Sequence, residues 1–231
     1  MRRVTTADLW HHFGRTRAIT DRTVPAAFHW TWSQDDGPGT EVLGDVTGLR
    51  VGDLGAGAAR HAAHLATCHQ PSWVDAIDAS PAQHAMATDL YSHLAPRLRL
   101  VPRDVVDHLT TNGTYDVLYS VFGAIDFADP HRMMPAVFGA LKPGGRLAFS
   151  TLAHYLSGAP GQTDVVPADI PAKTPDGEST TMRRWVLQEQ VWTKVLDEAG
   201  FTGIETTILP SATQGPRAAG TLLVTAVRPT A

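Results

Sequence analysis

The chain has 231 residues, a length that fits one α/β domain but leaves two smaller domains open. Hydrophobic residues make up 43% and charged residues 18%, which is the balance of a folded globular protein rather than a disordered one. The formal net charge is -4 and no basic block offsets it. That argues against nucleic acid as the main partner, because phosphate binding relies on clustered Lys and Arg.

Cysteine content and apolar runs exclude further classes of protein. The lone cysteine, Cys68, rules out an intramolecular disulfide and a multi-cysteine metal site. The charged N-terminus has no apolar stretch behind it, so it does not resemble a secretory signal. No window approaches the roughly 18–20 apolar residues that span a membrane. We therefore expect a cytoplasmic protein with no membrane partner.

Short β-rich runs alternate with stretches of helical spacing through the middle of the chain. The predicted strands are Leu49–Leu54, Trp73–Ile77, Leu98–Val101, Tyr115–Ser120 and Arg146–Thr151. The predicted helices between them are about Ala58–Cys68, Pro81–Leu94, Val105–Thr110 and Pro130–Leu141. Such repetition predicts a parallel sheet with helices on both faces, which is a three-layer α/β architecture.

The pattern changes after Thr151. Residues Leu152–Thr181 are rich in Gly, Pro, Asp and Thr with little periodicity, which predicts a lid or binding segment. A helix is predicted at Gln188–Ala199, and strands at about Gly203–Leu209 and Thr221–Val227. Two strands joined only by a loop are expected to be antiparallel neighbours, so the C-terminus should add an antiparallel element to the parallel sheet.

A glycine-rich turn between the first strand and the first helix is the sharpest motif, Asp53-Leu-Gly55-Ala-Gly57-Ala-Ala59-Arg60. Glycines let the backbone approach a ligand closely, and a helix N-terminus offers free N–H groups. A dinucleotide site requires a third glycine where Arg60 stands, so that fingerprint fails. An acid followed by x-G-x-G-x-small is instead typical of S-adenosylmethionine sites, in which Asp53 would hold the ligand's ammonium group. An ordinary tight turn is the alternative.

Two more acids stand at predicted strand ends. Asp78 ends the second strand, where a carboxylate is placed to accept hydrogen bonds from ribose hydroxyls. Its alternative role is a helix cap, although Ser80 already serves that purpose. Asp104 follows the third strand, where it is placed either to accept a hydrogen bond from an adenine amino group or to cap the next helix.

With an acid at each of three strand ends, the sequence resembles the class I S-adenosylmethionine-dependent methyltransferase family over roughly residues 46–227. The resemblance rests on Asp53-Leu-Gly-Ala-Gly57, Ile77-Asp-Ala-Ser-Pro81, Tyr115-Asp-Val-Leu-Tyr-Ser120 and Leu141-Lys-Pro-Gly-Gly-Arg-Leu147. It implies a Rossmann-like seven-stranded sheet, mostly parallel with an antiparallel last strand, plus an N-terminal helical cap. S-adenosyl-L-methionine is the implied cofactor and S-adenosyl-L-homocysteine its product.

The resemblance also implies a division of the chain and a set of cofactor residues. We expect a single domain over residues 1–231, with a cap (1–45), a cofactor-binding core (46–151), a substrate lid (152–185) and a C-terminal helix with antiparallel strands (186–231). The implied cofactor residues are Asp53, Gly55, Ala56, Gly57, Asp78, Ala79, Asp104, Val105, Ser120 and Val121. Ala59, in place of the commoner third glycine, is the visible departure from the family pattern.

The acceptor pocket is expected from the N-terminal region and from the loops after the fourth and fifth strands. Its predicted residues are Trp30, Trp32, Phe122 and His154, and the candidate catalytic groups are His154, His11 and Tyr155. Plainer alternatives are an exposed loop for His154, a solvated helix face for His11 and core packing for the two tryptophans. No metal site is predicted, since positioning supplies much of the catalysis in an in-line methyl transfer.

The absence of certain motifs narrows the range of possible methyl acceptors. No Asn-Pro-Pro-Tyr or Asp-Pro-Pro-Tyr follows the fourth strand and no Pro-Cys pair occurs, so the corresponding nucleic-acid methyltransferases are set aside. We expect methyl transfer to O or N of a small molecule, one of secondary metabolism, by a monomer or homodimer. Two alternatives stay open. One is a protein that binds the cofactor without methylating, as a cyclase or non-catalytic partner; the other is a dinucleotide oxidoreductase, which Arg60 disfavours.

Overall fold

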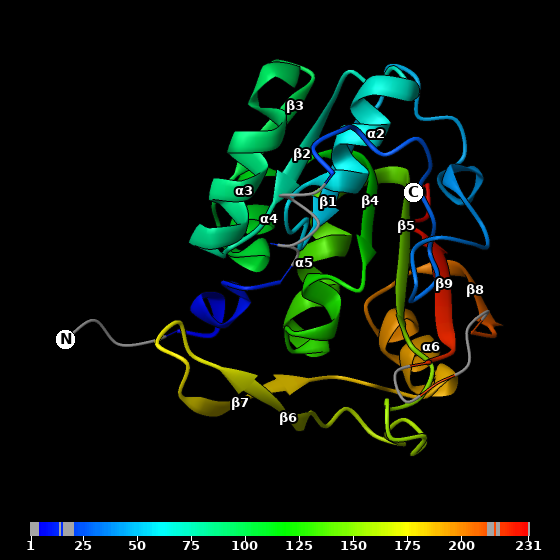
Figure 1. The fold of residues 1–231 in the computed structure, drawn as a ribbon. Coiled ribbons are helices and arrows are strands. Elements are labelled where there is room, and N and C mark those ends of the chain that lie inside the picture. The colour runs from blue at the N-terminus through cyan, green and yellow to red at the C-terminus, as the bar shows by residue number, and fades with distance from the viewer. Residues whose placement is uncertain (1–4, 14, 16–20, 212–214, 216–217, 231) are drawn as a thin grey trace.

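The computed structural model describes residues 5–13, 15, 21–211, 215 and 218–230. A seven-stranded sheet in the order β3-β2-β1-β4-β5-β9-β8 forms its middle layer (Figure 1). The strands are β1 (Arg50–Leu54), β2 (Trp73–Ile77), β3 (Leu98–Val101), β4 (Tyr115–Val121), β5 (Leu141–Leu152), β8 (Thr202–Leu209) and β9 (Thr221–Val227). β1 to β5 pair in parallel, whereas β9 lies antiparallel between β5 and β8. The predicted Rossmann-like sheet is confirmed.

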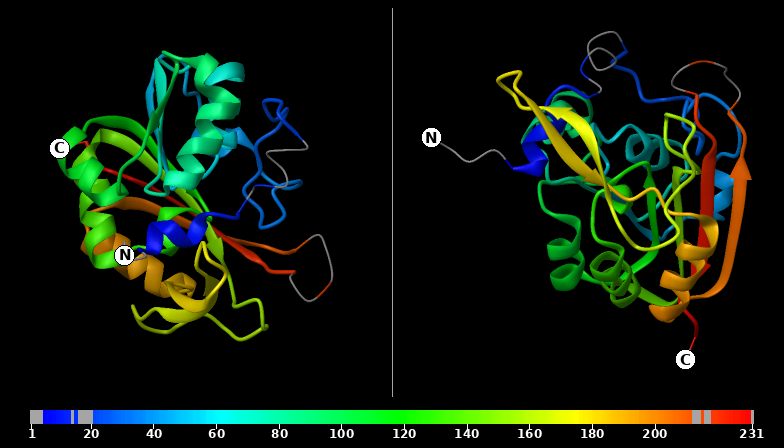
Figure 2. Two further views of the ribbon diagram at one scale, coloured as in Figure 1. Left: turned by 60° about the vertical axis from the view of Figure 1, so that its left-hand side comes forward. Right: turned by 90° about the horizontal axis from the view of Figure 1, so that it is seen from below.

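Helices cover both faces of this sheet (Figures 1 and 2). The α-helices are α2 (Arg60–Cys68), α3 (Pro81–Tyr91), α4 (Val105–Asn112), α5 (Pro130–Ala140) and α6 (Glu189–Glu198). The 3₁₀ helices are η1 (Thr6–Trp10), η2 (Thr40–Leu43), η3 (Ser92–Leu94) and η4 (Ala124–Asp126). One core cluster joins α4, α5 and α6 to the sheet, and a second joins α2, α3 and the N-terminal segment to the opposite face. The predicted N-terminal cap contributes η1 and η2.

Burial along β4 explains why this segment is a central strand. Successive side chains of a strand point to opposite faces, so a strand that is covered on both sides needs apolar residues throughout. Val117 and Tyr119 pack in the cluster of α2 and α3, while Leu118 packs in the cluster of α4, α5 and α6. All three are buried, as a strand covered on both faces requires.

Residues 152–185 contain an element that the sequence did not predict. Two strands, β6 (Ala168–Lys173) and β7 (Ser179–Arg184), form a separate antiparallel hairpin. Their connection contains Asp176-Gly177, and Gly177 adopts a φ of +85°, a turn conformation that glycine takes at no steric cost. Figure 2 shows the hairpin lying beside the N-terminal segment. The predicted lid is therefore an ordered β-hairpin with loops on either side.

Candidate functional site

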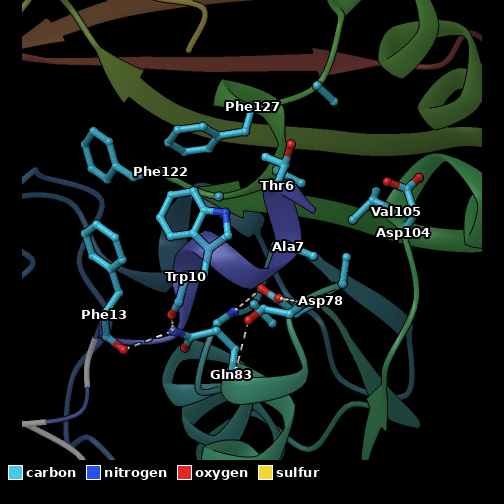
Figure 3. Close-up of a pocket in the computed structure, with 18 of the residues that line it drawn as sticks. Thr6, Ala7, Trp10, Phe13, Asp78, Gln83, Asp104, Val105, Phe122 and Phe127 are labelled. Carbon is cyan, nitrogen blue, oxygen red and sulfur yellow. Dashed lines mark hydrogen bonds between the residues drawn. The ribbon is translucent and has the colours of Figure 1, made fainter. Parts of the chain in front are cut away.

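The carboxyl ends of β1, β2 and β4 open into a cavity of about 1400 Å³ (Figure 3). This is the position at which open α/β sheets bind their ligands. The wall also includes residues of η1, of the first turns of α3 and α4, and of the β6–β7 hairpin. The site thus combines the edge of the parallel sheet with two segments that lie outside it.

The glycine turn packs directly against the loop that follows β4. Gly55 has a φ of +82°, and a Cβ atom built on it would stand 2.1 Å from the backbone nitrogen of Ala124. Gly57 has a φ of +55°, and its N–H donates a 2.8 Å hydrogen bond to the carboxylate of Asp78. Close backbone packing therefore requires glycine at position 55. The hydrogen bond from Gly57 to Asp78 connects the turn to the end of β2.

Asp53 is a buried carboxylate at the end of β1. It is 2% exposed, and it accepts a 2.9 Å hydrogen bond from the hydroxyl of Tyr119. Burial raises the pKa of the Asp53 carboxyl to about 7; the Tyr119 hydrogen bond opposes this rise and the nearby Asp78 adds to it. No cationic side chain of the described residues pairs with Asp53. A ligand ammonium group in the cavity would supply the missing positive charge.

Asp78 and Asp104 line the cavity from the neighbouring strand ends. The two carboxylate oxygens of Asp78 accept 2.8 Å hydrogen bonds from the backbone N–H groups of Gly57 and Ser80. Burial raises the pKa of the Asp78 carboxyl above its usual range. Asp104 caps α4 by accepting a 3.1 Å hydrogen bond from the N–H of Asp107. Both acids are therefore held in place by the backbone while they face the cavity.

The N-terminal segment is fastened over the site by Gln83 on the first turn of α3. The Gln83 amide donates 2.8 Å and 2.9 Å hydrogen bonds to the carbonyl oxygens of Trp10 and Phe13 (Figure 3). The indole of Trp10 packs edge-on against Phe127, with ring centroids 4.5 Å apart. Figure 3 shows these rings and Phe122 on one side of the cavity.

The β6–β7 hairpin is fastened by a buried ion pair. The Arg184 guanidinium lies 2.5 Å from the carboxylate of Asp126, and the two side chains are 7% and 0% exposed. The next residue, Trp185, donates a backbone hydrogen bond of 2.8 Å to the Asp126 carbonyl oxygen. The hairpin thereby places Met182 and Trp185 in the cavity wall next to the loop after β4.

Comparison with known proteins agrees with this geometry. A family model described as a methyltransferase domain matches residues 51–145, which include the glycine turn and the three acids at the strand ends. No curated protein gives a significant sequence match.

Solved structures of S-adenosylmethionine-dependent methyltransferases share the fold. A protein of Listeria monocytogenes assigned to this class is 20% identical, with 82% of this chain and 95% of that chain covered and a TM-score of 0.64. An enzyme of Mesorhizobium loti is 23% identical, with 81% and 94% covered and a TM-score of 0.56. The 1,6-didemethyltoxoflavin-N1-methyltransferase of Burkholderia thailandensis, solved with 1,6-didemethyltoxoflavin and S-adenosylhomocysteine, is 17% identical, with 79% and 72% covered and a TM-score of 0.52.

Residues 51–145 therefore match a methyltransferase domain, and the chain has the fold of class I S-adenosylmethionine-dependent methyltransferases. The cavity lies where this fold places its ligand, and its wall contains all of the predicted cofactor residues except Ser120. Those in the wall are Asp53, Gly55, Ala56, Gly57, Asp78, Ala79, Asp104, Val105 and Val121. Ser120 is fully buried behind the turn, where its hydroxyl donates a 2.7 Å hydrogen bond to the Leu54 carbonyl oxygen. Contact of these residues with the cofactor stays a prediction.

The predicted catalytic groups, His154, His11 and Tyr155, do not line the cavity. His154 accepts a 3.0 Å hydrogen bond from the Gly220 N–H at Nε2, which leaves the proton on Nδ1 to bond the Tyr155 carbonyl oxygen at 2.9 Å. Both ring nitrogens are thus engaged on the β9 side of the sheet. The hydroxyl of Tyr155 accepts a hydrogen bond from Gln162, and the ring of His11 bonds the Asp8 carbonyl oxygen.

Of the predicted acceptor residues, only Phe122 lines the cavity, and the others lie elsewhere. Trp30 is fully buried in the core, where its Nε1 donates a 2.8 Å hydrogen bond to the Gly39 carbonyl oxygen. Trp32 lies behind Phe122, with ring centroids 5.0 Å apart, and does not reach the cavity. Trp30 thus packs in the core cluster of α2 and α3, whereas Trp32 packs in a small separate cluster with Leu152, Val186 and Phe122.

Trp10 belongs to the N-terminal region from which the acceptor pocket was expected, and it does line the cavity. Sequence reasoning missed three further cavity residues: Phe13 of the N-terminal segment, and Met182 and Trp185 at the end of the hairpin. The hairpin carried a signal, because Pro175-Asp-Gly177 between two short runs is a typical turn sequence. Nothing in the sequence indicates that Gln83 would hold the N-terminal segment.

Within residues 5–13, 15, 21–211, 215 and 218–230, no three His, Cys, Asp or Glu side chains are grouped closely enough to bind a metal ion. Among those same residues, no helix has the length and apolar character that crossing a membrane requires.

Proposed function

We propose that this chain is an enzyme that transfers a methyl group from S-adenosylmethionine to an oxygen or nitrogen atom of a small molecule of secondary metabolism. The observation that carries the proposal is the buried carboxylate of Asp53, which faces the cavity without a cationic partner among the described residues. Support comes also from the family and from a fold neighbour that was solved with a small aromatic heterocycle and S-adenosylhomocysteine.

The residues of the cavity fit the cofactor. Asp53 would hold the ammonium group of its methionine part, next to a turn in which Gly55 leaves no room for a side chain. Asp78 would accept hydrogen bonds from the ribose hydroxyls. Asp104 and Val105 would flank the adenine, since both line the cavity at the start of α4.

Methyl transfer at this site would depend mainly on positioning. When bound, S-adenosylmethionine would supply a sulfonium-bound methyl group that passes to the acceptor's lone pair, with the carbon–sulfur bonding electrons left on sulfur and any O–H or N–H proton of the acceptor released to solvent as the product leaves. The walls from η1 and the hairpin would exclude bulk water and orient the acceptor. His154 has no part in this proposal, because both of its nitrogens are bonded elsewhere.

The first test is calorimetry of the full chain with S-adenosylmethionine and S-adenosylhomocysteine. Binding of either below about millimolar concentration is expected, and its absence would overturn the proposal. Asp78→Ala should weaken binding by about 1–3 kcal/mol through the lost ribose contact. Asp89→Ala is the matched control, since Asp89 is an exposed acid of α3 that pairs with Arg22.

The second test measures release of S-adenosylhomocysteine with a panel of small phenols and amines. Release that depends on the acceptor supports a methyltransferase. Cofactor binding with no release from any member of the panel would favour the alternative, a protein that binds S-adenosylmethionine without methylating. The lid at residues 152–185, the cytoplasmic location and the monomeric or homodimeric state stay predictions.

A further inference from the structure

The cavity has two chemically different sides. Asp78, Asp104 and Val105 lie on one side, and Trp10 with its aromatic neighbours lies on the other (Figure 3). The first side is the one assigned above to the cofactor. Four labelled rings, those of Trp10, Phe13, Phe122 and Phe127, lie on the second side. Together with the other lining side chains of these types they form a set of seven that we name the aromatic wall: Trp10, Phe13, Phe122, Phe127, Met133, Met182 and Trp185.

Four separate segments supply the aromatic wall. They are the N-terminal segment, the loop after β4, helix α5 and the end of the hairpin. Met133, Met182 and Trp185 are 1%, 5% and 6% exposed and form its buried part. Phe13 is 45% exposed, so its ring is largely open to solvent where it lines the cavity. Met133 and Trp185 also belong to the core cluster of α4, α5 and α6, whereas the rings of Trp10, Phe13, Phe122 and Phe127 are only partly covered and remain available to a ligand in the cavity.

The composition of the wall indicates the shape of its ligand. Aromatic rings pair by offset stacking or edge-to-face contact, and thioethers make favourable contacts with rings, so such a wall favours a flat aromatic molecule over a puckered aliphatic one. Four charged residues of α5 and the hairpin also line the cavity. They are Arg132, Arg183, Asp129 and Asp169, two of each sign, which favours an acceptor without net charge.

Resting on the function proposed above, we propose that the methyl acceptor is an uncharged aromatic ring compound, bound flat against the aromatic wall through its ring and methylated on a hydroxyl or amine substituent. The substituent would point to the cofactor side, since the rings occupy the opposite side. Oxygen and nitrogen on an aromatic ring both carry the lone pair that the transfer requires.

The wall is held in a fixed position relative to the cofactor side. Gln83 donates both amide hydrogen bonds to the segment that carries Trp10 and Phe13, and Gln83 itself follows Asp78 at the start of α3. The Asp126–Arg184 ion pair in turn holds the hairpin end that carries Met182 and Trp185. A ring bound between these segments would be placed by the same contacts that position the cofactor residues.

The test compares two probes of the same carbon skeleton on the full chain saturated with S-adenosylhomocysteine. 2-Naphthol is flat and aromatic, whereas trans-2-decalol is its saturated, puckered counterpart. Calorimetry should show 2-naphthol binding at least about tenfold more tightly. Trp10→Leu keeps an apolar side chain but removes the ring, and it should reduce this preference about fivefold or more. Trp73→Leu, at the other end of β2, is the matched control and should leave the preference unchanged.

The possible outcomes separate this inference from the proposed function. Equal affinity for the two probes, an unchanged preference in Trp10→Leu, or no binding of either probe to a chain that binds S-adenosylhomocysteine would each overturn the aromatic acceptor alone. Failure of S-adenosylhomocysteine itself to bind would overturn the proposed function, and this inference with it.

Discussion

The hydroxyl of Tyr119 donates a 2.9 Å hydrogen bond to the carboxylate of Asp53, and both side chains are buried. Tyr119 comes from the middle of β4, and its ring packs on Phe28 and Trp30 of the N-terminal segment. The pair therefore connects the cofactor side of the cavity to the core beneath it. Because burial raises the pKa of Asp53 to about 7, the charge of this carboxylate is set near neutral pH.

Binding of S-adenosylhomocysteine should strengthen as pH rises from about 5 to 7 and then level off. The ligand's ammonium group favours the ionised carboxylate, so binding below the raised pKa of Asp53 must release a proton. The slope should approach about tenfold in affinity per pH unit. Calorimetry across this range measures it, and Asp53→Asn should give weaker binding with a flat profile in that interval.

The same pKa shift sets the sign of the effect on stability. Because the folded-state pKa of Asp53 is raised, its contribution to stability is present at low pH and is lost as pH rises through about 7. The ligand-free Asp53→Asn variant should therefore melt at a higher temperature than the native chain at pH 8, with the difference shrinking toward pH 5. Tyr119→Phe should move the binding profile to higher pH, since the hydrogen bond lowers the pKa. An unmoved profile would contradict this role of Tyr119.

Gly55→Ala should destabilise the fold and abolish cofactor binding. The new Cβ would stand 2.1 Å from the Ala124 nitrogen, so the glycine turn or the loop after β4 must move. Gly158→Ala is the matched control, because Gly158 has a similar φ of +85° but nothing within 4 Å of the added atom. Chemical denaturation should show a loss of about 1–2 kcal/mol for the control and a larger loss for Gly55→Ala. Equal losses of stability in the two variants would show that crowding of the new Cβ against Ala124 does not matter.

Local chemistry made much of the sheet predictable. The predicted bounds Trp73–Ile77, Leu98–Val101 and Thr221–Val227 coincide with those of β2, β3 and β9. The hairpin was missed because its strands gain stability from tertiary contacts rather than from their own apolar pattern. Arg184 is the clearest case: its partner, Asp126, lies 58 residues earlier in the sequence.

Residues that follow parallel strands were expected to face the cavity, and one physical reason explains why Asp53 and Asp78 do so and His154 does not. Asp53 and Asp78 face the cavity because β1 and β2 end at that edge of the sheet. β5 is paired on its outer side with β9 up to Thr221, so the chain after β5 continues along β9. His154 therefore bonds the N–H of Gly220 rather than facing the cavity. The position of His154 is therefore set by β9, the antiparallel neighbour of β5, and that pairing depends on the topology of the whole sheet.

Gln83→Met should release the N-terminal segment while keeping the volume of the side chain. Both hydrogen bonds to the Trp10 and Phe13 carbonyl oxygens would be lost, so hydrogen exchange in residues 5–13 should accelerate and 2-naphthol should bind more weakly. Gln190→Met, an exposed position on α6, is the control and should change neither measurement. Unchanged exchange in Gln83→Met would show that the segment is held by its aromatic contacts alone.

Arg184→Met should unfold at a lower denaturant concentration than the native chain. Removal of the guanidinium leaves the fully buried Asp126 carboxylate without a cation, and a broken buried pair costs about 3–5 kcal/mol. Lys142→Met removes the cation from the more exposed Lys142–Asp116 pair and should cost less than about 1 kcal/mol. Adding Asp126→Asn to Arg184→Met should recover part of the loss, because the unpaired charge is then removed. If the double variant is no more stable than Arg184→Met, packing of the arginine rather than its charge holds the hairpin.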